Sequence, residues 1–485
     1  MRLRVLTTMA VMTAAAAASA QVPEYRVYCD PDDYAYMVEN YEEEIEIPCT
    51  VQVGDTLYVG ALIRLRGDSS RGYPKKSYRI TFADGQPLAG RTEWNFNGEY
   101  LDPTYMHAWL YSWIMGRLNY PCFDVDHAEM YVNDTYMGLY VRLEPVDEQF
   151  LSDRGMDPDG NLYKAAVDGA CLSRYDDVPA WWEKKANESE NWTDLYQLID
   201  WLDGADPDQL HQTMGQVFDM DRLMTILAVN ALTMNYSTYY HNYYVYRDIR
   251  GTGLWTMLAW DVDKLWGDWV TRSYTRSVNA FWHDNPLLEK VVLNPVLTEA
   301  FFARVDAVAG SLLTSGLITP VIDSLETAIT PSVEADTCDD LTPAEFHDAV
   351  ASMRDTVIQA RVDALDWMYS EDPRSFRAHC GDTVSLGEKF VSWEACYDPS
   401  SPDVQYHLLL HTEEGWPLDT CRFVQLEDTC WTFEDLDPGD YIWRVEGGGG
   451  YWWRYAEGYD RYNPFTVLDS WSELSGTLEI GRAHV

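Results

Sequence analysis

Hydrophobic and polar residues alternate along several stretches of the N-terminal third of the chain, as expected for strands with one buried face. Residues 56–66 and 77–82 predict two neighbouring strands, joined through a turn at 67–74 that contains Gly and Ser. Residues 128–132 and 137–143 predict a hairpin, because the Asn-Asp dipeptide between them is typical of a tight turn. Between these strand pairs, residues 106–118 carry apolar side chains at helical spacing and predict a helix.

The middle of the chain alternates helices with one further hairpin. Residues 191–202 and 221–233 predict helices, and we expect Asp221 at the N-cap of the second. Residues 243–247 and 255–258 predict two strands around a Gly-rich turn at 250–253. Long helical patterns follow at 295–329 and 342–369. This order of elements predicts an α+β fold.

The pattern changes near residues 371–373. Residues 380–467 consist of short strand patterns separated by Pro, Gly and aromatic residues, which predicts an all-β sandwich. Trp393, Tyr406, the segment Leu436-Asp-Pro-Gly-Asp-Tyr441 and Trp443 resemble an immunoglobulin or fibronectin type III domain, in which such a turn leads into a strand whose Tyr packs at the sheet edge. We therefore expect one domain at 21–372, a sandwich at 380–468 and a tail at 469–485.

Length and composition support this division. The chain has 485 residues, of which 46% are hydrophobic and 14% aromatic, so it can form two to four packed domains. It carries 35 Lys and Arg against 79 Asp and Glu, a net charge of −44. Such a surface repels phosphate backbones and anionic lipids, which excludes nucleic acid as an expected partner.

The first twenty residues are typical of an export signal. Arg2 and Arg4 precede an apolar stretch, and Ala18-Ser19-Ala20 fits a cleavage site, although a buried N-terminal helix is the alternative. We expect a secreted or cell-surface protein, and no membrane span after the signal. The last seven residues, 479–485, can be encoded by a string that resembles a common sequencing adapter, so we expect the natural chain to continue beyond about Leu478.

In an oxidising compartment the nine cysteines favour disulfides. Three local pairs are plausible: Cys29 with Cys49, Cys380 with Cys396, and Cys421 with Cys430. The odd number leaves at least one cysteine unpaired, and the lack of any C-x-x-C pair argues against a zinc or thioredoxin-like site.

Three segments are more polar than their neighbouring strands require. Residues 64–79 combine a Gly/Ser turn with Arg and Lys, an arrangement suited to phosphate oxygens, although a solvated basic hairpin is the alternative. Residues 234–246 lead from a helix into a strand. In residues 260–267, Asp261 and Asp263 would share one face of an extended segment and could both bind magnesium. Asp-x-Asp also occurs in glycosyltransferases, so a nucleotide-sugar site is a weaker alternative.

Together these segments resemble the CotH kinase family in the correct order. The motifs that carry the resemblance are Arg64-Leu-Arg-Gly-x-Ser-Ser, Pro74-Lys-Lys-Ser-Tyr78, Tyr131-Val-Asn-Asp-Thr-Tyr-Met-Gly-Leu-Tyr140 with Glu144, Asn161-Leu-Tyr-Lys164, His241-Asn-Tyr-Tyr-Val-Tyr246 and Trp260-Asp-Val-Asp263. The resemblance implies an atypical secreted kinase that uses ATP with Mg²⁺ or Mn²⁺ to phosphorylate Ser or Thr of extracellular or surface proteins.

The resemblance also implies roles for individual residues. A first group would hold the nucleotide, namely Lys75 or Lys76 with Arg66 and Ser70, and Lys164, for which a plain surface lysine is the alternative. Glu144 would orient the phosphate-binding lysine. Asn242 and Asp261 would bind the metal, with Asp263 as a second candidate.

One position departs from the family pattern. Ser237 stands five residues before Asn242, where a catalytic Asp is expected, and a serine hydroxyl is a poor proton acceptor. Either His241 or another carboxylate replaces it, or the chain is a binding scaffold that has lost turnover. The sequence leaves the oligomeric state open.

Overall fold

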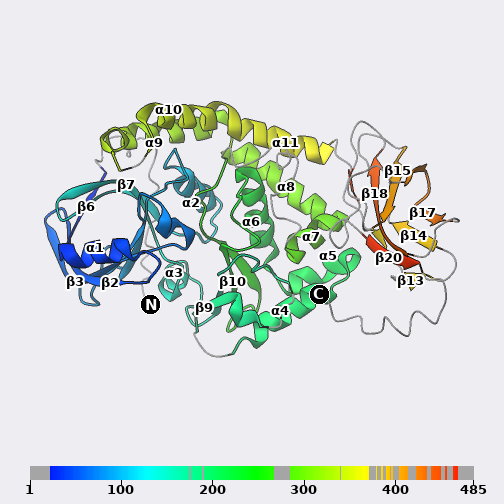
Figure 1. Cartoon of the computed structure of the whole chain (residues 1–485), viewed down its shortest axis with the longest axis horizontal. Helices are drawn as coiled ribbons and strands as arrows, with labels where there is room; N and C mark the ends of the chain where they lie inside the picture. Colours follow the sequence, from blue (N-terminus) through cyan, green and yellow to red (C-terminus); the bar gives the residue numbers. More distant parts are fainter. Residues whose placement is uncertain are drawn as a thin grey trace, which may run out of the picture.

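The structure, a computed structural model, describes residues 22–173, 175, 177–187, 191–266, 285–338, 340–370, 378–379, 384–385, 389–393, 395–396, 403–412, 422–433, 439–448, 454–455 and 463–467. The predicted export signal, the linker at 371–377 and the tail lie outside these residues. Figure 1 shows an N-terminal barrel, a central region of helices around a second sheet, and a C-terminal group of strands.

The N-terminal barrel closes from seven strands. They are β1 (Glu24–Cys29), β2 (Glu46–Val53), β3 (Thr56–Leu65), β4 (Tyr78–Thr81), β5 (Glu93–Asn97), β6 (Val125–Val132) and β7 (Thr135–Leu143). Their order around the barrel is β1-β2-β3-β4-β5-β7-β6, and the parallel pairing of β1 with β6 completes the circle. Alternate side chains of the strands fill the interior, as the sequence pattern predicts, and Val27, Ile63, Ile80 and Phe96 are fully buried.

The two predicted strand pairs of the barrel are confirmed. β3 pairs with β4 in antiparallel register, which places Arg64 opposite Arg79. β6 and β7 form the predicted hairpin, and both turn residues, Asn133 and Asp134, have a positive φ (48° and 63°), as a tight hairpin turn requires. Three helices accompany the barrel: α1 (Pro31–Glu39), the short 3₁₀ helix η1 (Ser69–Gly72) and α2 (His107–Arg117).

A second sheet of four strands lies in the central region. Its order is β11 (Trp255–Ala259), β10 (Tyr243–Arg247), β8 (Asn161–Ala165) and β9 (Trp182–Ala186), so the predicted β10–β11 hairpin is confirmed. The flanking helices are α3 (Glu148–Asp153), α4 (Thr193–Gly204), α5 (Leu210–Thr213) and α6 (Met220–Thr233), with 3₁₀ turns η2 (Val178–Ala180), η3 (Pro207–Gln209) and η4 (Met214–Gln216). The N-cap of α6 is Asp219 and not the predicted Asp221, because the Asp219 carboxylate accepts the Arg222 N–H.

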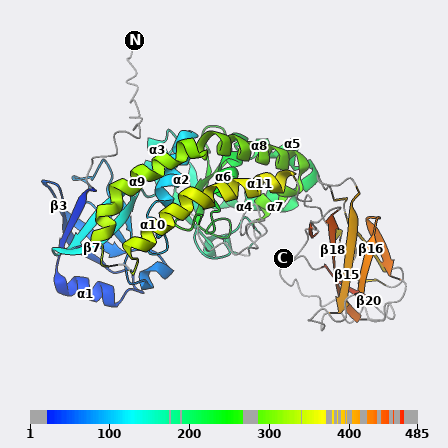
Figure 2. The ribbon, with the colours of Figure 1, turned by 90° about the horizontal axis from the view of Figure 1, so that it is seen from above.

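Five further helices complete the central region. They are α7 (Pro286–Leu293), α8 (Pro295–Leu312), α9 (Ser315–Ala335), α10 (Pro343–Ser352) and α11 (Ile358–Ser370), with a π-helical turn η7 at Met353–Val357. The helix predicted at 295–329 is therefore two helices, which bend by 61° at their junction. Figure 2 shows α9, α10 and α11 extending from the barrel to the side of α6 and α8. No single helix in the described residues is long and apolar enough to cross a membrane, and only the bent pair α8–α9 passes that test.

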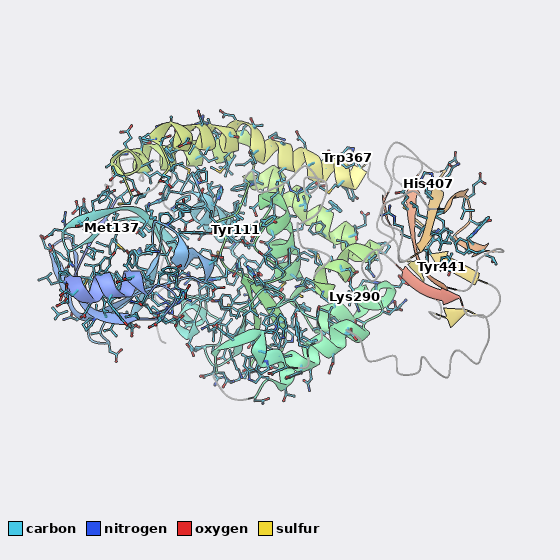
Figure 3. All side chains as sticks on the ribbon, viewed as in Figure 1. Tyr111, Met137, Lys290, Trp367, His407 and Tyr441 are labelled. Atoms are coloured by element: carbon cyan, nitrogen blue, oxygen red, sulfur yellow. The ribbon has the colours of Figure 1, made fainter. Side chains whose placement is uncertain are left out.

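Two hydrophobic cores hold these parts together. One fills the barrel, and the other joins α2, the second sheet and the helices from α4 to α11. Tyr111 of α2 belongs to the larger core and lies in its middle (Figure 3). Its hydroxyl donates to the Asn230 side chain on α6 at 2.7 Å, so a buried polar contact ties the two helices together.

The C-terminal strands form two sheets that share a small core. One sheet has the order β12 (Ala378–His379), β14 (Lys389–Trp393), β17 (Cys430–Phe433). The other has the order β13 (Val384–Ser385), β20 (Asn463–Val467), β18 (Gly439–Gly448), β15 (Gln405–Thr412), β16 (Arg422–Leu426), with β19 (Arg454–Tyr455) paired to β18. Trp393 from the first sheet packs against Tyr406 and Trp443 from the second. The all-β prediction holds for the described strands, and the likeness to fibronectin type III stays a prediction.

Candidate active site

Asn242 and Asp261 meet at the open end of the β10–β11 hairpin. Asn242 directly precedes β10, and one residue separates Asp261 from the end of β11. The Asn242 Nδ2 atom donates to Asp261 Oδ2 at 2.8 Å. Both residues have a left-handed backbone, with φ values of 57° and 55°. The Asn242 N–H also donates to the Ala165 carbonyl at the end of β8, which fixes the hairpin end to the neighbouring strand. Non-glycine residues in this conformation often occur at functional sites.

Two further carboxylates, those of Glu99 and Asp263, are coupled electrostatically to Asp261. Both Glu99 carboxylate oxygens and the Asp263 Oδ1 atom are buried without a partner that meets hydrogen-bond geometry. Burial is the main cause that raises the pKa of Glu99 and of Asp263 well above the usual range, and the charges of Asp102 and Asp261 raise both further. These acids therefore repel one another electrostatically, while Lys264 acts on Asp263 and Arg66 interacts with Glu99 in the opposite direction.

The donor set at this place fits a hard cation. Magnesium is commonly bound by one or two protein ligands together with phosphate oxygens and water, and an amide oxygen and carboxylate oxygens are suitable ligands. Asn242 and Asp261 supply both kinds of group. In the described part of the chain, no three His, Cys, Asp or Glu side chains form a complete metal cage. The left-handed backbone of Asp261 also means that the segment is not extended there, contrary to the prediction that Asp261 and Asp263 share one strand face.

Positive charge approaches the same place from two strands. Arg66, which follows β3, lies 5.7 Å from the Trp260 ring centre, and burial together with nearby Arg79 lowers its pKa to about 10, against the opposing charge of Asp261. Lys164 in β8 stands opposite Tyr244 of β10 and Glu183 of β9.

Lys164 is a half-buried lysine that is available for a ligand. Burial lowers its pKa, and the charges of Glu183 and Asp261 act against this shift. Within the described residues, no hydrogen bond or ion pair engages its ammonium group. Arg79 of β4, whose charge acts on both Arg66 and Tyr244, is a further cation here that sequence reasoning missed. Arg79 lies in the basic segment 64–79 but received no role of its own from the sequence, and in the structure it also pairs with Glu93.

The two lysines that the resemblance favoured for phosphate binding occupy other places. Lys75 and Lys76 precede β4 in a loop and do not lie on the strand. The Lys75 side chain is fully buried, and its Nζ atom lies 2.6 Å from Asp336 Oδ2 and 2.6 Å from the Tyr105 hydroxyl. Lys76 Nζ donates to the Arg71 carbonyl and lies 4.7 Å from the Tyr41 ring centre.

Ser70, the other candidate in the basic segment, belongs to η1. Its side chain lies against Gly67, whose φ is 101°, and a Cβ atom at that glycine would come within 1.9 Å of Ser70 Oγ. Gly67 is therefore required for this turn. Among the described residues, no hydrogen bond or ion pair links Ser70 to the Asn242–Asp261 pair.

Glu144 does not pair with a lysine, contrary to the prediction. Its Oε1 atom lies 2.7 Å from Arg91 and 3.0 Å from Arg154, and Asp124 N–H donates to its Oε2 atom at 2.9 Å. Glu144 is 1% exposed. Its bond to Arg154, the C-cap residue of α3, connects the segment after β7 to the end of that helix. The role of Glu144 is structural in the described conformation.

Ser237 lies in a loop that a buried amide network holds in place. Its N–H donates to Asn235 Oδ1, and Asn235 Nδ2 donates to Asn230 Oδ1 on α6. Asn285 Nδ2 donates to the Tyr239 carbonyl on the other side of the loop. Ser237 itself is 1% exposed, and its hydroxyl has no partner in the described conformation. A hydroxyl buried in this way is not a proton acceptor for a substrate.

The His241 Nδ1 atom is in hydrogen-bond contact with the Asp168 carboxylate. The loop that carries Asp168 is fixed to the same segment, because Gly169 N–H donates to the Tyr240 carbonyl at 2.9 Å. Burial lowers the pKa of His241, while the charges of Asp168 and Asp261 act in the opposite direction. Sequence reasoning missed Asp168, which lies 73 residues before its partner in the chain and belongs to no local motif.

The site combines an Asn–Asp pair at a hairpin end with two cations, Arg66 and Lys164, on which the charge of Asp261 acts. The sequence pattern of the family described as CotH kinase protein matches residues 63–365. The chain therefore belongs to the CotH kinase family.

Two known proteins are similar to it. Inner spore coat protein H of Bacillus subtilis (strain 168) is 26% identical over 330 residues, which cover 65% of this chain and 89% of that protein. The crystal structure of the proinflammatory kinase CtkA of Helicobacter pylori aligns with 60% of this chain and 95% of that chain, at 7% identity and a TM-score of 0.28.

Proposed function

We propose that this protein transfers the terminal phosphoryl group of ATP to Ser or Thr hydroxyls of proteins. The observation that carries the proposal is the contact between Asn242 and Asp261, since kinases hold their metal with an Asn and an Asp that follow one another in this order. Magnesium or manganese held by Asn242 and Asp261 would neutralise charge on the phosphates. Asp263 remains a second candidate ligand.

Arg66 and Lys164 are the groups best placed to bind the nucleotide phosphates. Arg66 follows β3 of the barrel, Lys164 lies in β8 of the second sheet, and the charge of Asp261 acts on both, which makes both candidates for contact with one triphosphate. The Lys164 ammonium supplies a point charge, whereas the Arg66 guanidinium can donate two parallel hydrogen bonds. Lys75, Lys76, Ser70 and Glu144 are not included in this proposal because their described contacts lie elsewhere.

His241 is the candidate that replaces the missing Asp as general base. With Nδ1 directed at Asp168, the Nε2 atom is the one left to accept a proton from an acceptor hydroxyl. This is the arrangement in which a carboxylate fixes the orientation of a histidine base. Ser237 is excluded from this role by its burial.

The second candidate function is a kinase-like binding scaffold without turnover, and Ser237 is the observation that favours it. Both candidates predict nucleotide binding, and only the first predicts transfer. We further propose that the protein acts outside the cell on surface or extracellular proteins, because its first twenty residues are typical of an export signal and its relative is a spore coat protein.

The test measures transfer of radiolabelled phosphate from ATP to a casein-like acceptor with Mg²⁺, alongside thermal shift with Mg²⁺-ATP. We expect label transfer by the natural protein and none by Asp261→Ala or Asn242→Ala. Ser237→Asp should not raise the rate, because the side chain at position 237 is buried in the loop and does not reach an acceptor hydroxyl. A natural protein that is stabilised by Mg²⁺-ATP but transfers no label would establish the scaffold function, and one that does neither would refute both.

A further inference from the structure

Cys29 and Cys49 stand directly opposite each other in the barrel. Cys29 is the last residue of β1, Cys49 lies in β2, and the antiparallel register of the two strands pairs them. Opposite residues of an antiparallel pair project from the same face of the sheet. Both side chains pack with the hydrophobic core of the barrel, with Cys49 buried and Cys29 half-buried.

The hydrogen bonds of β1 show which kind of pair this is. The Cys29 N–H donates to Asn133 Oδ1 at 3.0 Å, and the Val27 carbonyl accepts the Asn133 N–H at 2.8 Å. The polar backbone groups of residues 27 and 29 are therefore directed at the β6 side of β1 and away from β2. Cys29 and Cys49 thus form a non-hydrogen-bonded pair, the kind in which Cα atoms approach to about 4.5 Å.

This geometry meets the requirement of a disulfide. Bridged cysteines have Cα atoms about 4.4–6.8 Å apart and Cβ atoms about 3.5–4.5 Å apart. A non-hydrogen-bonded pair falls within the Cα range without movement of either strand. In the described state the two sulfurs are thiols, and their side chains project from the same face of the β1–β2 pair.

We propose that Cys29 and Cys49 form a disulfide that ties β1 to β2. With oxidised glutathione as the oxidant, one cysteine thiolate attacks its S–S bond and releases one glutathione as a thiol. The second cysteine thiolate then attacks the protein-bound sulfur of the mixed disulfide and releases the second glutathione. Two cysteine thiols are oxidised, one glutathione disulfide is reduced, and the two protons pass to the released thiolates.

The bridge would close the segment that contains α1 and would stabilise the barrel independently of any kinase activity. α1 (residues 31–39) lies wholly between the two cysteines. A disulfide around a loop of this size restricts the unfolded chain, and its loss lowers the melting temperature by several degrees. Burial raises the pKa of both thiols, that of Cys49 to about 12, so we expect oxidation to occur while the chain folds.

The experiment refolds the full chain in a buffer of reduced and oxidised glutathione, alkylates free thiols and maps peptides by mass spectrometry without reduction. We expect one species that joins the peptides of Cys29 and Cys49. Recovery of both cysteines as alkylated thiols, or of either joined to a different cysteine, would overturn the proposal.

Thermal unfolding of the oxidised protein supplies the second measurement. Cys29→Ser, Cys49→Ser and the double variant should lower the melting temperature by the same amount, about 5 °C or more, because each removes the same bond. Cys122→Ser, which changes a half-buried cysteine of the other core, is the matched control and should leave the mapped bridge intact. Additive losses from the two single variants would instead show separate packing roles and contradict the bridge.

Discussion

Lys75 and Asp336 form a buried ion pair that joins the barrel to the helical region. The Nζ–Oδ2 distance is 2.6 Å, and the two side chains are 0% and 4% exposed. Asp336 directly follows α9, and its carboxylate also accepts the N–H groups of Leu139 on β7 and of Cys338. A lysine within a family motif therefore has a structural partner here, and Lys164 is the lysine that the proposed function assigns to the nucleotide.

This division of roles predicts that one lysine variant loses stability and the other loses affinity for ATP. Lys75→Met leaves the Asp336 charge buried without its cation, so we expect a loss of about 3–5 kcal/mol in the free energy of unfolding. Lys164→Met removes no ion pair among the described residues and should change stability little, but weaken ATP binding at least about tenfold, or about 1.4 kcal/mol. Chemical denaturation and nucleotide titration of each folded variant measure the two effects. Weaker ATP binding by folded Lys75→Met than by Lys164→Met would reverse the assignment.

Gly138 provides an independent test of the same contact. Its φ is 102°, and a Cβ atom there would lie 2.2 Å from Asp336 Oδ2. Gly138→Ala should therefore displace the carboxylate and cost clearly more than the ~1 kcal/mol that a left-handed alanine costs by itself. Gly54→Ala is the matched control, because Gly54 has a φ of 56° and nothing within 4 Å of the added atom. Equal losses of unfolding free energy in the two variants would show that the Asp336 contact is unimportant.

The raised pKa of Glu99 predicts how the stability of the folded protein depends on pH. Its pKa is raised in the folded protein, mainly by burial and then by Asp102, Asp263 and Asp261, while Asn97 lowers it. The folded state therefore binds more protons than the unfolded state between the two pKa values, so stability falls as pH rises above the unfolded value of about 4.5.

Glu99→Gln removes this dependence because the amide stays neutral. We expect the variant to be more stable than the natural protein at pH 8, with the difference shrinking toward pH 4. Melting temperatures across this range measure the effect. Glu43→Gln, on an exposed loop, is the control and should shift the curve at neither end. A Glu99→Gln gain that did not change with pH would contradict the titration of Glu99.

The sequence predicted the elements whose signals are local. Alternating residues identified β3 and β4, and the Asn133–Asp134 turn identified the β6–β7 hairpin. The resemblance to the family also predicted that Asn242 and Asp261 act together, and the structure places them in contact. Each of these features depends on neighbours in the chain or on a motif with fixed spacing.

Contacts between distant residues could not be predicted in the same way. Lys75 and Asp336 are separated by 261 positions, and no spacing rule connects them. The resemblance to the family implies a lysine partner for Glu144, but Arg91 and Arg154 are the cations that the tertiary fold brings to it. Periodicity also continues across the α8–α9 bend, because each helix keeps an apolar face toward the same core.

The buried side-chain amide of Asn230 anchors the loop that contains Ser237 through Asn235. Asn230 is 1% exposed, and its side chain contacts Tyr111, Asn235 and Tyr239. Asn230→Ala leaves these groups without their shared partner, so we expect a loss of about 2–4 kcal/mol in unfolding free energy, from unpaired buried groups at about 1–3 kcal/mol each. Transfer activity should fall with it, because the loop that leads to His241 and Asn242 loses its anchor.

A double-mutant cycle separates this network from simple loss of packing. Tyr111→Phe removes one hydroxyl of the network and keeps the ring in the core, where the ring is fully buried. In the natural background it should cost about 1 kcal/mol, and in the Asn230→Ala background it should cost almost nothing, because its acceptor is already gone. Equal costs of Tyr111→Phe in both backgrounds would show that the Tyr111–Asn230 bond does not hold the two helices, and that the position of the loop depends on other contacts.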